Sequence, residues 1–274
     1  MTVVYDTPAD GVARLTLDRP EVRNAQNVQL LYDLNAAFDR AAADDDVRVV
    51  ILAANGPHFS AGHDLYEDPV AVIGEHRTVG TWCGFGCAGA EGRMGIEKEI
   101  YLGFSERWRN LPKPTIAQVH GKVIAGGLML VWPCDLVVAS DDATFADNTV
   151  AMGVAGAEFF HHPWEVGARK AKEMLFTSDE LTAADALRVG MVNHVVPRQE
   201  LPAFTLALAS RIAAKPLFAL KTAKEAVNAA QDAQGRPSAM QTAFALHQLC
   251  HTHNLVVHGQ LIDPGYLAPR KADA

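Results

Sequence analysis

Two glycine-containing segments constrain the fold of this chain more than any other feature. Residues 59–65 (FSAGHDL) and 120–130 (HGKVIAGGLML) each follow a short apolar run and lead into an expected helix. Glycine lets the main chain approach a neighbour closely, and the first N–H groups of a helix lack hydrogen-bond partners. Two such N–H groups side by side stabilise a carbonyl oxygen that gains negative charge during a reaction. A Gly-Gly pair is also common where a strand simply turns into a helix, so either segment alone is a weak signal.

Strand-like and helix-like runs alternate along most of the chain. The expected strands lie at residues 12–17, 47–53, 115–119, 136–139 and 192–196. Two expected helices carry apolar residues at helical spacing, namely Leu31, Leu34, Phe38 and Ala41, then Ile96, Ile100, Phe104 and Trp108. Residues 123–134 are predicted as a buried core helix, because they are too few to cross a bilayer. This interleaving predicts an α/β fold with buried sheets.

The chain after Pro202 changes character. Residues 206–214, 217–230 and 238–257 are all helical in pattern, and Pro197 and Pro202 bracket the change. With 274 residues and 49% hydrophobic content, the chain can bury a large core, so we expect one main domain with a helical extension.

Charge and cysteine content exclude several classes of function. A formal net charge of -8 argues against a nucleic-acid or membrane-surface partner, for which clustered positive charge is needed. Cys83, Cys87, Cys134 and Cys250 form no C-x-x-C pair and are expected to be free thiols. The first residues show no basic stretch followed by an apolar one, which predicts no export signal and a cytoplasmic location.

Five stretches follow one another in an order that is typical of a known family. They are residues 19–25 (RPEVRNA), 59–65, 113–121 (KPTIAQVHG), 134–140 (CDLVVAS) and 182–192 (TAADALRVGMV). Together they resemble the crotonase (enoyl-CoA hydratase/isomerase) superfamily. The resemblance implies a spiral of ββα turns with an acyl-CoA site in residues 1–200. It also implies that residues 201–274 form a helical region that packs between the subunits of a homotrimer or a dimer of trimers.

The resemblance also assigns residues to an oxyanion hole. Its two donors are the main-chain N–H groups of His63 and Gly126, and the family's triple glycine reads Ala125-Gly126-Gly127 here. Substrate contacts are implied, besides these two donors, for Arg23, Ala25, Ala61, Asp64, Leu65, Tyr66 and Thr149. Lys221 and Lys224 are further candidates for contacts with the negative charge of CoA. Asp64 could instead cap the following helix. No cofactor is implied, since CoA is part of the substrate.

The catalytic carboxylates of the family are missing from their usual places. Hydratases carry one Glu just after the glycine triplet and a second about twenty residues later, but these positions are Met129 and Thr149 here. A thioether has no proton to give, and a threonine hydroxyl is too weak an acid without a neighbouring base. Hydration by two glutamates is therefore in doubt.

Glu158 is the first candidate to replace them. It precedes an apolar segment, residues 159–164, that we expect to raise its pKa toward a useful value. Glu158 could instead be a helix-start carboxylate that the helix dipole favours. His162, then His161 and Asp147, are the other acid–base candidates, because histidine titrates near neutrality.

Residues 67–95 interrupt the pattern. Glycines at positions 74, 80, 84, 86, 89, 92 and 95 make a stable helix there unfavourable, since each costs about 1 kcal/mol in a helix interior. In the family this stretch borders the acyl pocket, so it is either a mobile lid or a plain surface loop. Trp82, Phe85 and Tyr101 could line that pocket.

A metal site is not expected. His247, His251 and His253 include an i, i+4 pair that could bind an ion, yet the sequence shows no third ligand type, and the family is metal-free.

The resemblance therefore implies an enoyl-CoA hydratase/isomerase that stabilises an enolate in its oxyanion hole. Double-bond isomerisation, or another reaction with one base, is easier to support than hydration, which uses two carboxylates. The alternatives are a non-catalytic acyl-CoA binding protein and a crotonase-fold hydrolase acting on a thioester or a β-diketone.

Overall fold

The computed structural model describes residues 2–80 and 82–267. Its strands are β1 (Val3–Ala9), β2 (Val12–Leu17), β3 (Val49–Ala54), β4 (Thr115–Val119), β5 (Lys122–Ile124), β6 (Leu136–Ser140), β7 (Thr144–Ala146), β8 (Leu181–Thr182) and β9 (His194–Val196). The α-helices are α1 (Val28–Ala43), α2 (Pro69–Val72), α3 (Ala90–Glu97), α4 (Phe104–Arg109), α5 (Leu128–Val131), α6 (His162–Thr177), α7 (Ala183–Val189), α8 (Leu201–Ala213), α9 (Leu217–Ala233), α10 (Arg236–His258) and α11 (Pro264–Leu267). Five 3-10 turns cover Pro20–Val22, Ile73–Glu75, Ala125–Gly127, Val150–Met152 and Arg198–Glu200 within these residues, and a π-helical turn, Lys98–Gly103, joins α3 to α4.

The strands form two sheets. The larger sheet has the order β1-β2-β3-β4-β6-β9, in which β1 and β2 are antiparallel and the other neighbours are parallel. The smaller sheet has the order β5-β7-β8. Interleaved parallel strands and helices confirm the predicted α/β class, and the expected strands at 115–119, 136–139 and 192–196 correspond to β4, β6 and β9.

Both faces of the larger sheet are buried. In β3, Val50 and Leu52 face the main core, whereas Val49 and Ile51 pack with Leu208 of α8 on the opposite face. Successive side chains of a strand point to opposite faces, so a continuous apolar run is what a doubly covered strand requires.

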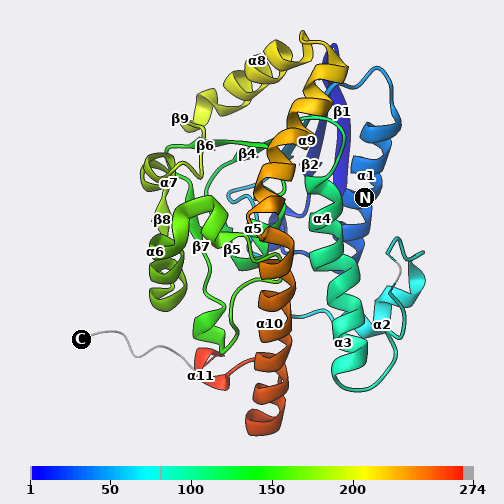
Figure 1. The fold of residues 1–274 in the computed structure, drawn as a ribbon, viewed down its shortest axis with the longest axis vertical. Coiled ribbons are helices and arrows are strands. Elements are labelled where there is room, and N and C mark those ends of the chain that lie inside the picture. The colour runs from blue at the N-terminus through cyan, green and yellow to red at the C-terminus, as the bar shows by residue number, and fades with distance from the viewer. Residues whose placement is uncertain (1, 81, 268–274) are drawn as a thin grey trace.

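The rod formed by α3, the π-helical turn and α4 buries the predicted apolar stripe. Ile96, Ile100, Phe104 and Trp108 all lie in the main core, which confirms the helical spacing read from the sequence. Figure 1 shows this rod running beside α10, so two helices more than a hundred residues apart in the chain lie next to each other.

The helices after Pro202 were predicted correctly as α8, α9 and α10. Figure 1 shows α9 and α10 forming a long arm, while α8 covers the sheet. Within the described residues, no single helix is long and apolar enough to cross a membrane. Residues 198–213 and 217–233 meet that criterion only as a pair, by length and composition, with a bend of 105° between them.

Two sequence predictions of local structure were wrong. Residues 123–134 do not form one helix, because β5 continues to Ile124 and a 3-10 turn precedes the short α5. Residues 90–97 do form a helix, α3, despite Gly92 and Gly95. A Cβ on Gly92 would lie 2.1 Å from the carbonyl oxygen of Cys87. This glycine therefore allows a loop to pack against the helix, and that close packing outweighs its low helix propensity.

This close approach predicts the effect of adding one methyl group. Gly92→Ala should lower the free energy of unfolding by about 1–3 kcal/mol, because a main-chain carbonyl cannot move aside without shifting the loop. Gly86→Ala is the matched control, since a Cβ there meets nothing within 4 Å. Denaturant unfolding of both variants measures the difference, and equal midpoints would contradict this account.

Candidate functional site

The two glycine segments lie against each other at the end of the smaller sheet. A bridge pairs Ser60 with Val123, and Ile124 N–H donates to the Ser60 carbonyl at 3.1 Å. A Cβ on Gly126 would lie 2.6 Å from the His63 ring and 3.2 Å from the His63 amide nitrogen. Only glycine fits at this position, which explains why the middle glycine of the triplet is present.

The amides of His63 and Gly126 are the donors that the sequence singled out. Gln26 and His63 form a parallel β-bridge. In this bridge the Gln26 N–H donates to the Gly62 carbonyl, and the Asp64 N–H donates to the Gln26 carbonyl. The His63 N–H points the other way, and it has no acceptor among residues 2–80 and 82–267. Gly126 lies in the 3-10 turn that begins α5, where amides lack helical partners.

Both segments line a cavity of about 200 Å³. Ala61, Leu65 and Thr149, which were predicted to contact the substrate, line it too. Its remaining walls include aliphatic side chains such as Ile124 and Val154. The titratable groups on its wall include His63, Glu158, His247 and His251. The cavity is thus mostly apolar, with a few convergent polar groups, as is typical of ligand sites.

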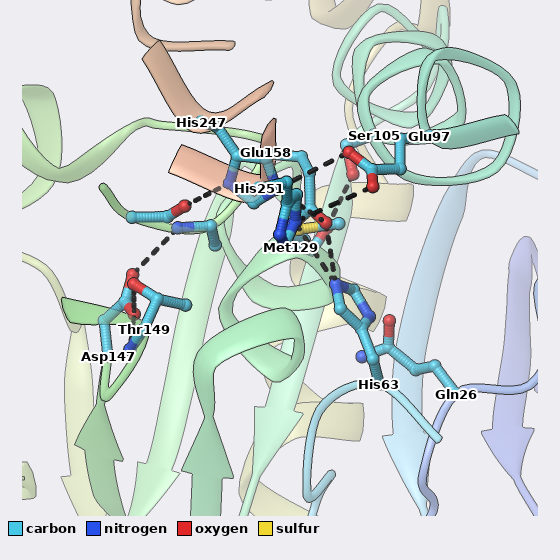
Figure 2. A network of polar contacts seen from close by, with 12 residues as sticks. Gln26, His63, Glu97, Ser105, Met129, Asp147, Thr149, Glu158, His247 and His251 are labelled. Carbon is cyan, nitrogen blue, oxygen red and sulfur yellow. Dashed lines mark hydrogen bonds and ion pairs between the residues drawn. The ribbon is translucent and has the colours of Figure 1, made fainter. Parts of the chain in front are cut away.

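Glu158 is the carboxylate of this cavity. It is only 3% exposed, and His63 Nε2 donates to its Oε2 at 3.1 Å (Figure 2). Burial by itself would raise the pKa of Glu158, but the neighbouring His63 and His247 lower it to about 2. The expected upward shift of this pKa was therefore wrong, because the two imidazoles outweigh the apolar segment that follows Glu158.

The π-helical turn positions an aromatic ring over His63. Tyr101 stacks on the His63 imidazole with ring centroids 3.9 Å apart. Insertions of this kind in a helix are frequent at functional sites. Tyr101 and the hydrogen bond to Glu158 together fix the orientation of the His63 side chain.

His247 and His251 enter the site from one face of α10. His247 Nε2 lies 3.6 Å from Glu158 Oε1 and 3.5 Å from Glu97 Oε2, and His251 Nε2 lies 3.8 Å from Glu97 Oε1. Burial would lower the pKa of His247, but Glu158 and Glu97 raise it to about 9. Figure 2 shows Glu97, His247, His251 and Glu158 gathered together.

Asp147 and His162 form a separate buried pair. His162 Nε2 donates to Asp147 at 2.7 Å, and both side chains have no exposed surface. Asp147 also accepts from the amides of Thr149 and Ala157, at 2.9 and 3.1 Å. His162 is not part of the cavity wall, and its hydrogen bond holds residues 147–157 in place. His161 is likewise bonded elsewhere, to Glu165.

Met129 and Thr149, at which the resemblance expects glutamates, make other contacts here. Met129 is buried in the main core, and its carbonyl accepts from Ser105. Thr149 lines the cavity, but its hydroxyl donates to Asp147 at 2.5 Å.

The remaining predicted contacts lie around the first glycine segment. Ala61 N–H donates to the Arg23 carbonyl at 2.9 Å, which joins the early loop to this segment. The Arg23 side chain is exposed, and Ala25 is half-buried. Tyr66 is fully exposed and does not line the cavity.

Two charged residues have partners that the sequence did not suggest. Asp64 pairs with Arg19 at 3.3 Å. The next helix is capped by Asp68, so the predicted capping role of Asp64 was wrong. Lys224, a candidate for CoA contacts, pairs with Asp135 at 2.8 Å.

Sequence reasoning missed the role of α10 and of Glu97 in this site. The i, i+4 spacing of His247 and His251 was visible, but Glu97 lies 150 residues earlier. The one local sequence feature that points to Glu97 is its position directly after Ile96, beside the apolar stripe of an expected helix.

Comparisons with known proteins agree with this architecture. Residues 7–75 and 88–259 match the enoyl-CoA hydratase/isomerase family. The chain belongs to this family and thus to the crotonase superfamily, and it is an enzyme of a family that acts on acyl-CoA substrates.

Particular relatives support the assignment. A structure described as a probable enoyl-CoA hydratase from Mycobacterium smegmatis superimposes with a TM-score of 0.86 at 48% identity, covering 96% of this chain and 100% of that chain. A similar one from Mycobacterium thermoresistibile gives 0.87 at 47% identity, with the same coverage. The 4-chlorobenzoyl coenzyme A dehalogenase-2 of an Arthrobacter species is 32% identical over 209 residues, 76% of this chain and 71% of the relative.

The buried pair predicts how stability depends on pH. Burial raises the pKa of Asp147, but hydrogen bonds from His162 and Thr149 lower it below the ordinary 3.8. A carboxyl group whose pKa is lower in the folded protein than in the unfolded chain stabilises the fold. This stabilisation is complete above the pKa of the unfolded chain and is lost as the pH falls through the pKa of the folded protein. Asp147→Asn should therefore cost about 1.5–3 kcal/mol at pH 7 and make the loss of stability below pH 3.8 shallower.

The matched control is Asp39→Asn, at an exposed ion pair with Arg107. This change should cost less than about 1 kcal/mol. Urea unfolding between acidic and neutral pH compares the two, and similar pH profiles would show that Asp147 is not the stabilising carboxylate.

Proposed function

We propose that this enzyme transfers a proton to and from the α or γ carbon of an acyl-CoA thioester, as in double-bond isomerisation. The amides of His63 and Gly126 stabilise the enolate oxygen, and Glu158 is the base. One observation carries the proposal: both glycine segments and the Glu158 carboxylate line the same cavity.

Enolate formation needs stabilisation of negative charge where it develops. Removal of an α-proton places charge on the thioester oxygen, and fixed N–H donors in a site shielded from water stabilise it strongly. The His63 amide is fixed by the neighbouring bonds to Gln26, and Gly126 approaches it without a side chain between them. These two donors need no rearrangement when the charge appears.

A single base fits the residues better than a pair. The Thr149 hydroxyl is bonded to Asp147, and Met129 is packed in the core. Glu97 is a second buried carboxylate, but it lies on the far side of His247 and does not line the cavity. Glu158 is thus the carboxylate on the described wall of the cavity, held in position by His63.

Two other functions remain as competitors. A non-catalytic acyl-CoA binding protein would use the same cavity and exchange no protons. A crotonase-fold hydrolase would release free CoA or cleave a carbon skeleton, and the dehalogenase relative illustrates that related sequences carry other reactions on CoA thioesters.

Deuterium exchange separates these functions. The protein in D2O should incorporate deuterium at the α or γ carbon of an acyl-CoA, and Glu158→Gln should slow this by about 10²–10⁴. Gly126→Ala should slow it by about 10²–10³, because the methyl group would collide with the His63 ring at 2.6 Å. Hydration of crotonyl-CoA should fall far below the ~1–10³ s⁻¹ usual for enzymes.

The matched control is Glu165→Gln, since Glu165 bonds to His161 and does not line the cavity. It should leave exchange unchanged. Rapid hydration by the unmodified protein would refute the one-base reading. Exchange that survives Glu158→Gln would assign the base elsewhere, and no exchange with any acyl-CoA would favour the binding protein.

We also propose that the helices after Pro202 mediate assembly into a trimer or a dimer of trimers. α9 has no buried residues, and Phe218 on it is 79% exposed. Leu249 and Val256 on α10 are also largely exposed. Phe244, on the same helix, belongs instead to the main core. Exposed large apolar side chains along both helices favour an interface along this arm.

Sedimentation at micromolar concentration tests this assembly. The protein should sediment as a trimer or hexamer, and Phe218→Glu should shift it toward smaller species by placing a charge in the contact. Phe176→Glu is the matched control, because Phe176 is 74% exposed on α6, outside the proposed interface. A monomeric unmodified protein would contradict the proposal.

A further inference from the structure

Three metal-ligating side chains converge between α3 and α10. Glu97, His247 and His251 are all buried, and one ligand atom from each lies within 4.8 Å of the others. The proposed proton transfer uses none of these three groups directly. They come from two helices that pack together, α3 and α10.

Each of these side chains is oriented by a partner of its own. His247 Nδ1 donates to the Gly156 carbonyl at 2.7 Å, and His251 Nδ1 donates to the Leu261 carbonyl at 2.8 Å. A carbonyl can only accept, so each Nδ1 carries the proton and each Nε2 is directed at Glu97. Gln248 donates to the Glu97 carboxylate. Metal-binding histidines and carboxylates are held by outer hydrogen bonds of this kind.

The spacing of the atoms suits a shared ion better than direct hydrogen bonds. His247 Nε2 is 3.5 Å from Glu97 and His251 Nε2 is 3.8 Å from it, and His247 Nε2 has no hydrogen-bond partner within the described chain. Tetrahedral zinc with bonds of about 2.0–2.1 Å holds its ligand atoms about 3.3 Å apart. The three ligand atoms lie within 4.8 Å of one another, so the side chains would move together by as much as about 1.5 Å to complete such a site.

The local charge also favours a cation. Glu97 and Glu158 are 6% and 3% exposed, and within the described residues their ion-pair partners are histidines, with no Lys or Arg among them. Buried carboxylates are costly unless a positive charge or a metal compensates them. A divalent ion bound by Glu97 and the two histidines would compensate the buried Glu97 carboxylate.

We propose that Glu97, His247 and His251 bind a divalent transition-metal ion, with zinc as the best fit. Two imidazole nitrogens and one carboxylate suit zinc, whereas calcium and magnesium prefer oxygen ligands. His247 and His251 also line the cavity, so water can take the fourth position. The sequence shows the histidine pair but not its third ligand, because Glu97 is distant from both histidines along the chain.

This site is tested by measuring metal binding to the full chain. The protein carries no purification tag, and no acyl-CoA is present. After dialysis against a chelator, calorimetric titration with zinc should give one ion per chain. Glu97→Gln and His251→Gln should each weaken binding by more than ~100-fold, beyond the 10–100-fold effect of losing an outer partner. His253→Gln is the matched control, since His253 is exposed on the same helix.

Cobalt(II) gives a second readout that requires no variant. The intact protein should show the strong visible absorption of a four-coordinate ion. No stoichiometric binding, a weak octahedral spectrum, or affinity unchanged in Glu97→Gln and His251→Gln would each overturn the proposal. Glu158→Gln should still bind one ion, so a failure of the proposed proton transfer and a failure of this site are distinguishable.

Discussion

The close approach of Gly126 to His63 is the contact on which the rest of the site depends. A side chain at position 126 would strike the His63 ring at 2.6 Å, and the ring would then leave Glu158. His63 therefore has two tasks, because its amide lies beside Gly126 while its imidazole positions the carboxylate. The strand pairing of Ser60 with Val123 brings the two segments together, so the sheet determines the geometry of the cavity.

The sequence was sufficient to predict the α/β class and most of its elements, because apolar periodicity reflects which faces are buried. The stripe Ile96, Ile100, Phe104 and Trp108 is an example. Prediction from the sequence failed at Gly92, where a tertiary contact outweighs helix propensity. It also failed at residues 123–134, where an apolar run fits a strand as well as a helix. Short apolar runs carry no information about which neighbour will cover them.

The candidate site divides in the same way. His63, Gly126 and Glu158 could be found from local motifs, and the structure brings them to one cavity. The electrostatic environment of Glu158 could not be predicted from local motifs, because it depends on His247 in α10, almost ninety residues away. An apolar neighbouring segment suggested a raised pKa for Glu158, but the opposite shift follows from two imidazoles that only the fold brings near.

Met129 and Thr149 stand where the resemblance expects the hydratase glutamates, and the charge of the site lies elsewhere. Thr149 now supports Asp147 and the loop that ends at Glu158, while Met129 adds to the core. Negative charge instead enters the site from Glu158 and Glu97, and three histidines surround it. A histidine can hold a proton or a metal ion, whereas methionine and threonine at the hydratase positions can hold neither usefully. The proposed base, Glu158, comes from the loop before α6, and the side chains around it come from the first glycine segment, α3 and α10.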